Sequence, residues 1–518
     1  MAGVIIQKNY VSTSINNTSL ANNWMVLVYG VTSQGPTKPT LVQSYTSFLN
    51  TFGQPVTGVL THPYVRFLLE NGVPVLFRRT VDANELVAAK ASVGVTDGPR
   101  LFYAVANDAY AGAVGNKLGI AISKNETTGA VVLQVVETKT ATSSQEVNIA
   151  KVLETFSLGQ SLGEDYGQLV YNFVKQASES VNNVSNYVHF TDVNQTASDW
   201  DNVFPLPVAA LTGGTEPENT LENALKMLSN ETSALYTDAK LLDAPTYYPQ
   251  LRFVTTGGII DSDTDKQNVI LNNLGTFATN CKSSFRVLVD YSLEVIDYSI
   301  VRQFAQTVAS ENKISPAIFA YFGYWGADSN NNYLPGSAGF LTALARSNYT
   351  VYSRRMAGTG FTPAYTKPYK EIYIDAYKDW QADNAIQLNP IMIVDAQDNM
   401  AIMGSSTLAL PSNSLNTKNP AQALDIVCVG DYVAAILNGL ALSELKAALD
   451  RLSLSSLSNR MSQEVERFVT SGAITKYDLN FDTTQLGKLG IECVLYFAIG
   501  LEEVTLTITS TYDTDLIS

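Results

Sequence analysis

The side chains that most often carry out chemistry are scarce in this sequence of 518 residues. It has two histidines: His62 precedes a proline, and His189 lies in a run of strand-forming residues. A catalytic or metal-binding histidine needs an acidic residue, a thiol or a second ligand at a suitable spacing, and neither histidine has one. We therefore interpret both as solvated or hydrogen-bonded core residues, and we predict no catalytic residue and no metal site.

Two glycine-containing segments have the composition of phosphate-binding loops. Segment 112–117 lacks the P-loop spacing and precedes a predicted strand, whereas a P-loop precedes a helix. Gly257 and Gly258 follow a predicted parallel strand, where nucleotides bind in such sheets, but a third glycine is missing and the next residues are acidic. Neither segment meets the requirements for phosphate binding, so we expect no cofactor.

Asp290 and two arginine pairs are the remaining polar candidates. Asp290 ends a predicted strand at 285–290, a position where catalytic acids occur, but the sequence offers no partner base. The pairs at 78–79 and 354–355 are interpreted as solvated or interface charges, not as anion sites. None of these residues therefore predicts a catalytic site.

The composition describes a globular protein with a large core and an acidic surface. Hydrophobic residues make up 46% and charged residues 16%, and the net charge is 33 − 48 = −15. This balance argues against nucleic acid as the main partner, because a phosphate backbone attracts a basic face. We predict no signal peptide and no direct membrane insertion, since the longest apolar run, 491–501, is about half the ~20 residues of a membrane helix. Three widely spaced cysteines are expected to be free thiols in a reducing compartment: Cys281, Cys428 and Cys493.

The elements that must position these residues change in kind along the chain. An opening unit contains strands and two helices, with Ser44 as an expected helix cap, Pro63 in a first turn and Gly72 as a stop. Short strands separated by turns then predict an antiparallel β-rich region, which includes a helix at 166–177. Next come three strands, each followed by a helix, and Asp263 is the expected cap of the first of these helices. This alternation predicts a parallel sheet covered by helices on both faces.

The C-terminal part is expected to be α+β. Two strands joined by a polar turn, 391–394 and 400–403, predict a hairpin. A strand at 425–429 is expected to precede two helices, the second capped by Ser458 and ended by Gly472. A buried strand at 491–499 closes this part.

Both ends of the chain have the pattern of extended arms. Alternating apolar and polar residues predict a strand at 504–509, and short apolar patches lie near the N-terminus. A strand needs a partner edge, either in its own subunit or in a neighbouring one. The residues expected to pair are Val4, Ile5, Ile6, Tyr10, Val11, Val504, Leu506 and Ile508.

Over most of its length the sequence resembles the contractile tail sheath proteins of tailed bacteriophages. No single motif is specific, and the shared order of the segments carries the resemblance. The chain departs from the family pattern at 324–326 and at 430–432. The resembling segments include, in chain order, Val28-Tyr29-Gly30, Gly35-Pro36, Phe52-Gly53, Glu70-Asn71-Gly72, Gly115-Asn116-Lys117-Leu118, Leu211-Thr212-Gly213-Gly214, Leu334-Pro335-Gly336-Ser337-Ala338-Gly339, Gly404-Ser405-Ser406-Thr407-Leu408 and Ser471-Gly472-Ala473-Ile474.

The resemblance implies an α+β multidomain chain that polymerises as helical rings around a tail tube. Its arms would add strands to neighbouring subunits, and contraction would drive the tube through the host envelope. The implied partners are further copies of the chain, the tail tube protein, and the baseplate and tail terminator proteins, in the virion and, during assembly, in the host cytoplasm. The expected division is 1–23 (N-terminal arm), 24–87 (first part of the sheath core), 88–205 (β-rich insertion domain), 206–375 (α/β middle domain with the parallel sheet), 376–500 (C-terminal α+β sheath core domain) and 501–518 (C-terminal arm).

Three alternatives remain open at this point. The chain could be the sheath of a phage-derived contractile injection particle, which the sequence does not distinguish from a phage tail. It could be a soluble α/β enzyme that uses the parallel sheet, since a fold does not by itself imply a function. It could also be another self-assembling protein, such as a tube or surface-layer subunit, whose polymers would never shorten.

Overall fold

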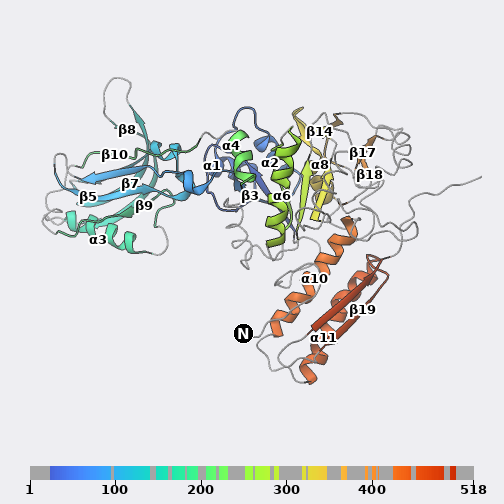
Figure 1. Cartoon of the computed structure of the whole chain (residues 1–518). Coiled ribbons are helices and arrows are strands. Elements are labelled where there is room, and N and C mark those ends of the chain that lie inside the picture. Colours follow the sequence, from blue (N-terminus) through green and yellow to red (C-terminus); the bar gives the residue numbers. More distant parts are fainter. Residues whose placement is uncertain are drawn as a thin grey trace, which may run out of the picture.

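The structure is a computed structural model of the whole chain (Figure 1). It has a central parallel sheet, a β-rich region on one side of it, and a helical C-terminal unit. The residues that the structure describes are 24–94, 98–125, 127–140, 147–160, 166–180, 184–196, 206–217, 221–230, 251–260, 263–280, 285–290, 318–322, 325–346, 363–369, 391–394, 400–403, 407, 424–444, 451–482 and 490–497.

The central sheet has six strands in the order β13-β12-β11-β1-β3-β2. All neighbouring pairs are parallel except β2 with β3. Strands β1 and β3 come from residues 24–87, and they share this sheet with strands from residues 206–375. The strands are β1 (Met25–Gly30), β2 (Thr40–Val42), β3 (Val75–Arg79), β11 (Leu251–Thr255), β12 (Arg286–Asp290) and β13 (Phe319–Phe322).

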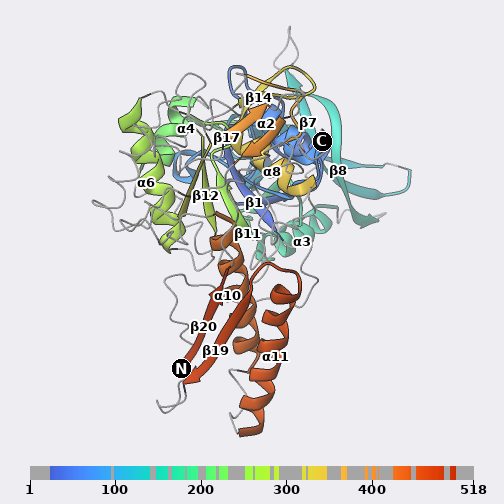
Figure 2. The same cartoon turned by 90° about the vertical axis from the view of Figure 1, so that its right-hand side faces the viewer.

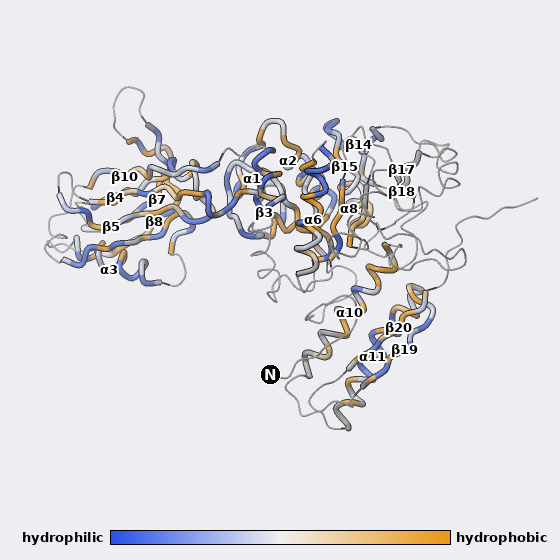
Figure 3. The backbone as a smooth tube through the Cα atoms, viewed as in Figure 1, coloured by the Kyte–Doolittle hydropathy of each residue, from blue (hydrophilic) through white to orange (hydrophobic). Residues whose placement is uncertain are grey.

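Helices cover both faces of this sheet. Successive side chains of each strand point to opposite faces, so apolar residues on both faces pack against helices. In β1, Val26 and Val28 belong to one core with helices α1, α2 and α8, whereas Leu27 and Tyr29 belong to the other with α4 and α6. In Figure 3, orange segments at α8 and α6 mark hydrophobic residues of these two cores. The helices are α1 (Tyr45–Phe52), α2 (Thr61–Glu70), α4 (Leu221–Leu228), α6 (Thr264–Asn280) and α8 (Gly336–Arg346).

Several predicted helix ends are confirmed. The Ser44 side chain accepts a hydrogen bond from the Ser47 N–H, so it caps α1. Asp263 likewise accepts from the Asp265 N–H at the start of α6, at 3.0 Å. Gly72 follows α2 with a φ of 77°, a left-handed conformation that favours glycine and ends the helix.

The β-rich region contains two antiparallel sheets around one core, and Figure 1 shows it projecting from the central sheet. Its strand orders are β10-β6-β7-β8 and β4-β5-β9, and α3 packs beside them. The prediction of antiparallel strands here is confirmed. The elements are β4 (Lys90–Gly94), β5 (Arg100–Ala106), β6 (Leu118–Lys124), β7 (Ala130–Thr140), β8 (Val147–Gln160), α3 (Tyr166–Glu179), β9 (Val188–Thr191) and β10 (Ala209–Ala210).

The chain enters and leaves the β-rich region through two adjacent segments. Val87 pairs with Thr215, and Lys90 pairs with Thr212, both in antiparallel bridges. The backbone N–H of Val87 donates to the Thr215 carbonyl at 2.8 Å, and the reverse hydrogen bond measures 3.1 Å. The region is therefore an insertion whose two ends are hydrogen-bonded to each other.

Two small sheets flank the central unit. The predicted hairpin is confirmed by antiparallel pairing of β17 (Ile391–Val394) with β18 (Met400–Met403). The other sheet has the order β15-β14-β16, and β14 and β15 contact α8. Just before β16, the Tyr365 hydroxyl accepts a hydrogen bond from the Gly339 N–H of α8 at 2.8 Å. Its strands are β14 (Trp325–Ala327), β15 (Tyr333–Pro335) and β16 (Lys367–Pro368).

The C-terminal unit corrects three predictions. The expected strand at 425–429 is wrong, because these residues lie in helix α10 (Leu424–Glu444). A short apolar run does not distinguish a buried strand from a buried helix, and α10 is apolar on several sides because it contacts two cores. The expected cap Ser458 lies inside α11 (Arg451–Thr470), whose buried stripe at Leu457, Met461 and Val465 continues through this position.

The third corrected prediction is the buried closing strand at 491–499, which is in fact one half of a hairpin. Strand β20 (Gly490–Tyr496) pairs with β19 (Lys476–Asp482) as an antiparallel hairpin, and only one of its faces packs against the helices. Of β20, only Ile491 is fully buried. Figure 2 shows this hairpin lying alongside α10 and α11, below the central sheet.

Candidate functional site

Both histidines are bonded inside the protein, as predicted. His62 is 1% exposed, and its Nε2 lies 3.0 Å from the Gly53 carbonyl oxygen. The Nδ1 of His189 lies 3.0 Å from Oδ1 of Asn107. Burial lowers the pKa of both imidazoles, which favours the neutral form of each ring.

The two glycine segments have packing roles. Gly112 has a φ of 95°, and a Cβ there would lie 2.7 Å from a carboxylate oxygen of Glu216. A Cβ on Gly257 would lie 2.6 Å from the Tyr29 carbonyl oxygen. These glycines are therefore explained by close contacts of the backbone with neighbouring groups.

Asp290 lies in a buried polar cluster at the carboxyl end of β12. Its Oδ1 accepts the Ser337 N–H at 2.9 Å, and its Oδ2 lies 2.5 Å from the Ser337 hydroxyl. That hydroxyl is 2.7 Å from the Tyr64 hydroxyl, which is 3.3 Å from the hydroxyl of Thr255. Because Ser337 lies in the first turn of α8, the Asp290 side chain caps this helix from the end of β12. The cluster thus connects β11 and β12 to α2 and α8.

Burial raises the pKa of Asp290 to about 7, although the Ser337 hydrogen bonds act in the opposite direction. The ordinary value is 3.8. Between these two values the folded chain binds a proton that the unfolded chain has released, so the stability from this group is complete below pH ~4 and is lost as the pH rises through about 7.

The variant Asp290→Asn is expected to remove this pH dependence, because the amide is neutral and keeps the shape of the carboxyl. The loss of melting temperature between pH 5 and pH 8 should be smaller in the variant than in the original chain, as measured by calorimetry. Asp265→Asn, at an exposed position of α6, is the control and should leave the pH dependence unchanged. An unchanged loss in Asp290→Asn would contradict the assignment.

The arginine pair 78–79 corrects a prediction. Both side chains are buried, at 1% and 0% exposure, and are not solvated. Arg79 donates through Nη2 to Glu216 at 2.7 Å and through Nε to the Thr32 carbonyl at 3.2 Å, and Arg78 donates to the carbonyl of Val81 at 3.1 Å. The Arg79–Glu216 bond joins the end of β3 to the segment that leaves the insertion. Sequence periodicity does not reveal Glu216 as the partner of Arg79, because the two residues are more than 130 positions apart. The second predicted arginine pair, 354–355, lies outside the described residues.

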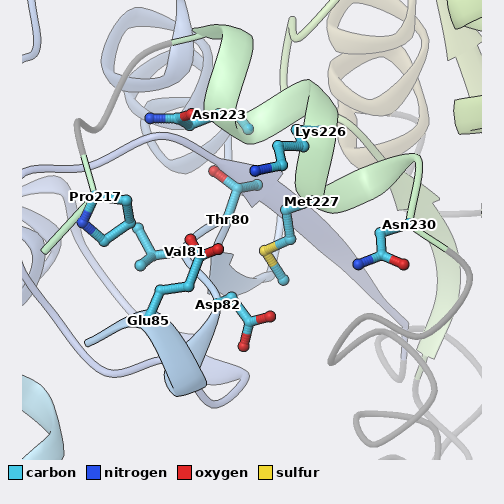
Figure 4. Close-up of a pocket in the computed structure, with 10 residues that line it drawn as sticks. Thr80, Val81, Asp82, Glu85, Pro217, Asn223, Lys226, Met227 and Asn230 are labelled. Atoms are coloured by element: carbon cyan, nitrogen blue, oxygen red, sulfur yellow. The ribbon is translucent and has the colours of Figure 1, made fainter. Parts of the chain in front are cut away.

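A small polar pocket lies next to Arg78 and Arg79, between the end of β3 and α4 (Figure 4). Its volume is about 40 Å³, far below the ~300–1,000 Å³ of small-molecule sites. Asp82, Glu85 and Lys226 contribute charges of both signs. Within the described ranges, no three His, Cys, Asp or Glu side chains come together as a metal site. Of the helices in the same ranges, none has both the length and the apolarity needed to cross a bilayer.

The β19–β20 hairpin is the strongest candidate for an interaction site. Each strand has seven residues, and the side chains of Tyr477, Leu479 and Leu495 pack toward the helices. The opposite face is mostly polar but includes the exposed Val494, and the Tyr496 hydroxyl donates to Asp478 at 2.7 Å. Among the described strands, β19 and β20 pair only with each other. The outer edge of a two-stranded sheet is a place where a further strand can add.

Sequence reasoning missed half of this site. Residues 476–482 alternate between polar and apolar side chains, which is the pattern of a strand with one buried face. That pattern could have predicted β19. The predicted arm residues at both chain ends lie outside the described residues: Val4, Ile5, Ile6, Tyr10, Val11, Val504, Leu506 and Ile508.

The described residues thus define a mixed α+β protein of several sheets with a two-stranded C-terminal hairpin. Comparison with solved structures gives the fold a name. A sheath tail protein from Listeria innocua is similar over 93% of this chain and 96% of that chain, with a TM-score of 0.56 and 13% identity. The chain therefore has the fold of a sheath tail protein, as the resemblance implied.

Other solved structures are similar at lower scores. A sheath tail protein from Desulfitobacterium hafniense covers 96% of this chain and 100% of its own, with a TM-score of 0.49 and 10% identity. The helical sheath of the anti-feeding prophage in its contracted state covers 98% and 99%, with a TM-score of 0.47 and 11% identity. No protein-family model and no curated protein matches the sequence.

Proposed function

We propose that this chain is the structural subunit of a contractile phage tail sheath. The observation that carries the proposal is the likeness in fold to the Listeria sheath tail protein along nearly the whole of both chains. In this proposal the subunits polymerise as helical rings around the tail tube and act without catalysis. The partners are further copies of the chain, the tube, the baseplate and the tail terminator. The sheath belongs to the virion and assembles in the host cytoplasm.

The β19–β20 hairpin is the proposed acceptor of arm strands from neighbouring subunits. In this proposal each strand of the hairpin offers one edge, and the sequence predicts two arms, at 1–23 and 501–518. An arm strand of about six residues spans ~20 Å, and each added backbone hydrogen bond contributes ~1 kcal/mol net. The paired strands would hold the subunits together while their globular parts rotate and slide. The extended sheath would be metastable, and contraction would release free energy stored during assembly.

The domain division predicted from the sequence is kept in this proposal with one shift. The insertion domain, predicted as 88–205, is extended to Thr215, because β10 pairs with β6 and Thr215 pairs with Val87. Residues 376–500 form the C-terminal part of the sheath core. The strands of 24–87 and 206–375 act together, since they share the central sheet.

The sheath of a phage-derived injection particle is the second candidate, because it requires the same fold and the same arms. The neighbouring genes distinguish the two: a capsid gene beside this one favours a phage tail. A polymer of either kind must shorten, which separates both candidates from a tube or surface-layer subunit.

Negative-stain electron microscopy of the purified protein at high concentration tests the proposal. We expect long, striated, hollow cylinders, because the contracted assembly has the lower free energy and forms without a tube. A sample with added tube protein is the control, and it should contain longer sheaths that shorten on triggering. Discrete particles at every concentration, with and without the tube protein, would contradict the proposal.

A further inference from the structure

Helix α10 is one continuous helix that contributes to two separate cores. Leu424, Val427 and Cys428 are buried in the core that covers one face of the central sheet. From Val429 onward, the buried residues of the helix pack with α11 and the hairpin instead. Figure 2 shows α10 running from the central strands into the C-terminal unit. This helix therefore joins the unit that carries the hairpin to the central sheet.

A buried ion pair lies where α10 passes from one core to the other. Nη2 of Arg286, the first residue of β12, donates to Oδ2 of Asp431. Both residues are nearly inaccessible, at 2% and 3% exposure. A pair this deeply buried is unlike a surface ion pair, because removal of one partner leaves a charge without compensation in a poorly solvated place.

A second arginine from the neighbouring strand contacts the next residue of the helix. The guanidinium of Arg252, in β11, lies 5.1 Å from the centre of the Tyr432 ring, and both residues are buried. This distance is within the range of a cation–π interaction. Two adjacent strands thus contact two adjacent residues of α10. The hydrophobic effect is non-directional, whereas an ion pair and a cation–π contact are directional, so these two contacts add a preference for one rotation of the helix.

We propose that Arg286 and Asp431, supported by Arg252 and Tyr432, lock the orientation of the C-terminal unit relative to the central sheet. They are positioning residues. The lock acts within one subunit, so it is present in the unassembled chain and does not depend on the proposed function. In a sheath, it would make the hairpin turn together with the central sheet.

Distance measurements between spin labels test this lock on the unassembled full-length chain. Leu41 and Val494 are exposed positions on β2 and β20, at 50% and 39%, and each is replaced by a labelled cysteine. The three native cysteines are first replaced: Cys281→Ser, Cys428→Ala and Cys493→Ser. We expect one narrow distance distribution for this chain, because the two units keep one orientation.

Arg286→Gln and the isosteric Asp431→Asn are each expected to broaden the distribution about twofold, since either change leaves a buried charge unpaired. The charge swap Arg286→Asp with Asp431→Arg should restore most of the narrow distribution. Arg467→Gln removes an exposed ion pair to Glu464, at 2.8 Å, and is the matched control that should change nothing. All variants are measured below their unfolding temperature, with circular dichroism as the check of folding. An unchanged width in both single variants, or no recovery in the charge swap, would overturn the proposal.

Discussion

Deletion of residues 501–518 is expected to abolish polymerisation while the rest of the chain keeps its fold. The deleted segment contains the alternating residues at 504–509, and every described member of the four cores comes before it in the chain. In the proposed assembly, one edge of every hairpin would lose its added strand without this arm, at ~1 kcal/mol for each backbone hydrogen bond. Because this loss recurs at every subunit, the effect on a long polymer should be complete. Deletion of residues 1–23 should act in the same way at the other edge.

A shorter deletion provides the control for this result. Removal of residues 512–518 takes away the polar tail and keeps the predicted strand, so this variant should still form cylinders under the electron microscope. Circular dichroism and thermal unfolding of all deletions should match those of the full chain. Contractile cylinders formed by the 501–518 deletion would disprove the role of this arm.

Phe48→Ala is expected to destabilise the central unit by about 3–5 kcal/mol. Phe48 is fully buried on α1, and its ring centre lies 4.9 Å from that of Phe77, 5.2 Å from Phe52 and 5.1 Å from His62. Truncation leaves a cavity between two helices and the sheet, and well-packed rings cannot collapse to fill it. Urea unfolding followed by circular dichroism should show the transition of this unit at lower urea.

Leu41→Ala is the matched control for this substitution. Leu41 lies on β2 of the same sheet, but half of its surface is exposed. Its truncation should change stability by less than about 0.5 kcal/mol. An equal effect of the two substitutions would show that the aromatic cluster is not a rigid core.

Signals that act over a few residues allowed correct predictions. Ser44 and Asp263 accept hydrogen bonds from backbone groups two or three residues away, so each helix start is encoded beside the residue itself. Gly72 ends its helix for an equally local reason, its positive φ. The parallel sheet was predictable because strands buried on both faces are continuous apolar runs between helices.

Features that depend on distant partners were not predictable in this way. Arg79 looks like a surface charge until Glu216 is placed beside it, and Asp431 has no visible role without Arg286. The first residues of α10, 425–429, were predicted as a strand because they are apolar without a clear period, and that composition results from contacts with two cores. The same limit applies to the proposed acceptor hairpin, whose added strands would come from neighbouring subunits.

The hydrogen-bonded ends of the insertion give the chain a modular architecture. Because Val87 and Thr215 lie opposite each other in an antiparallel bridge, the backbone could be closed there by a short turn, as in a β-hairpin. Evolution could thus enlarge, exchange or remove the entire region without altering the register of the central sheet. For engineering, the same junction is a natural place to graft a foreign domain, such as an enzyme or an epitope, onto each repeating copy of the chain.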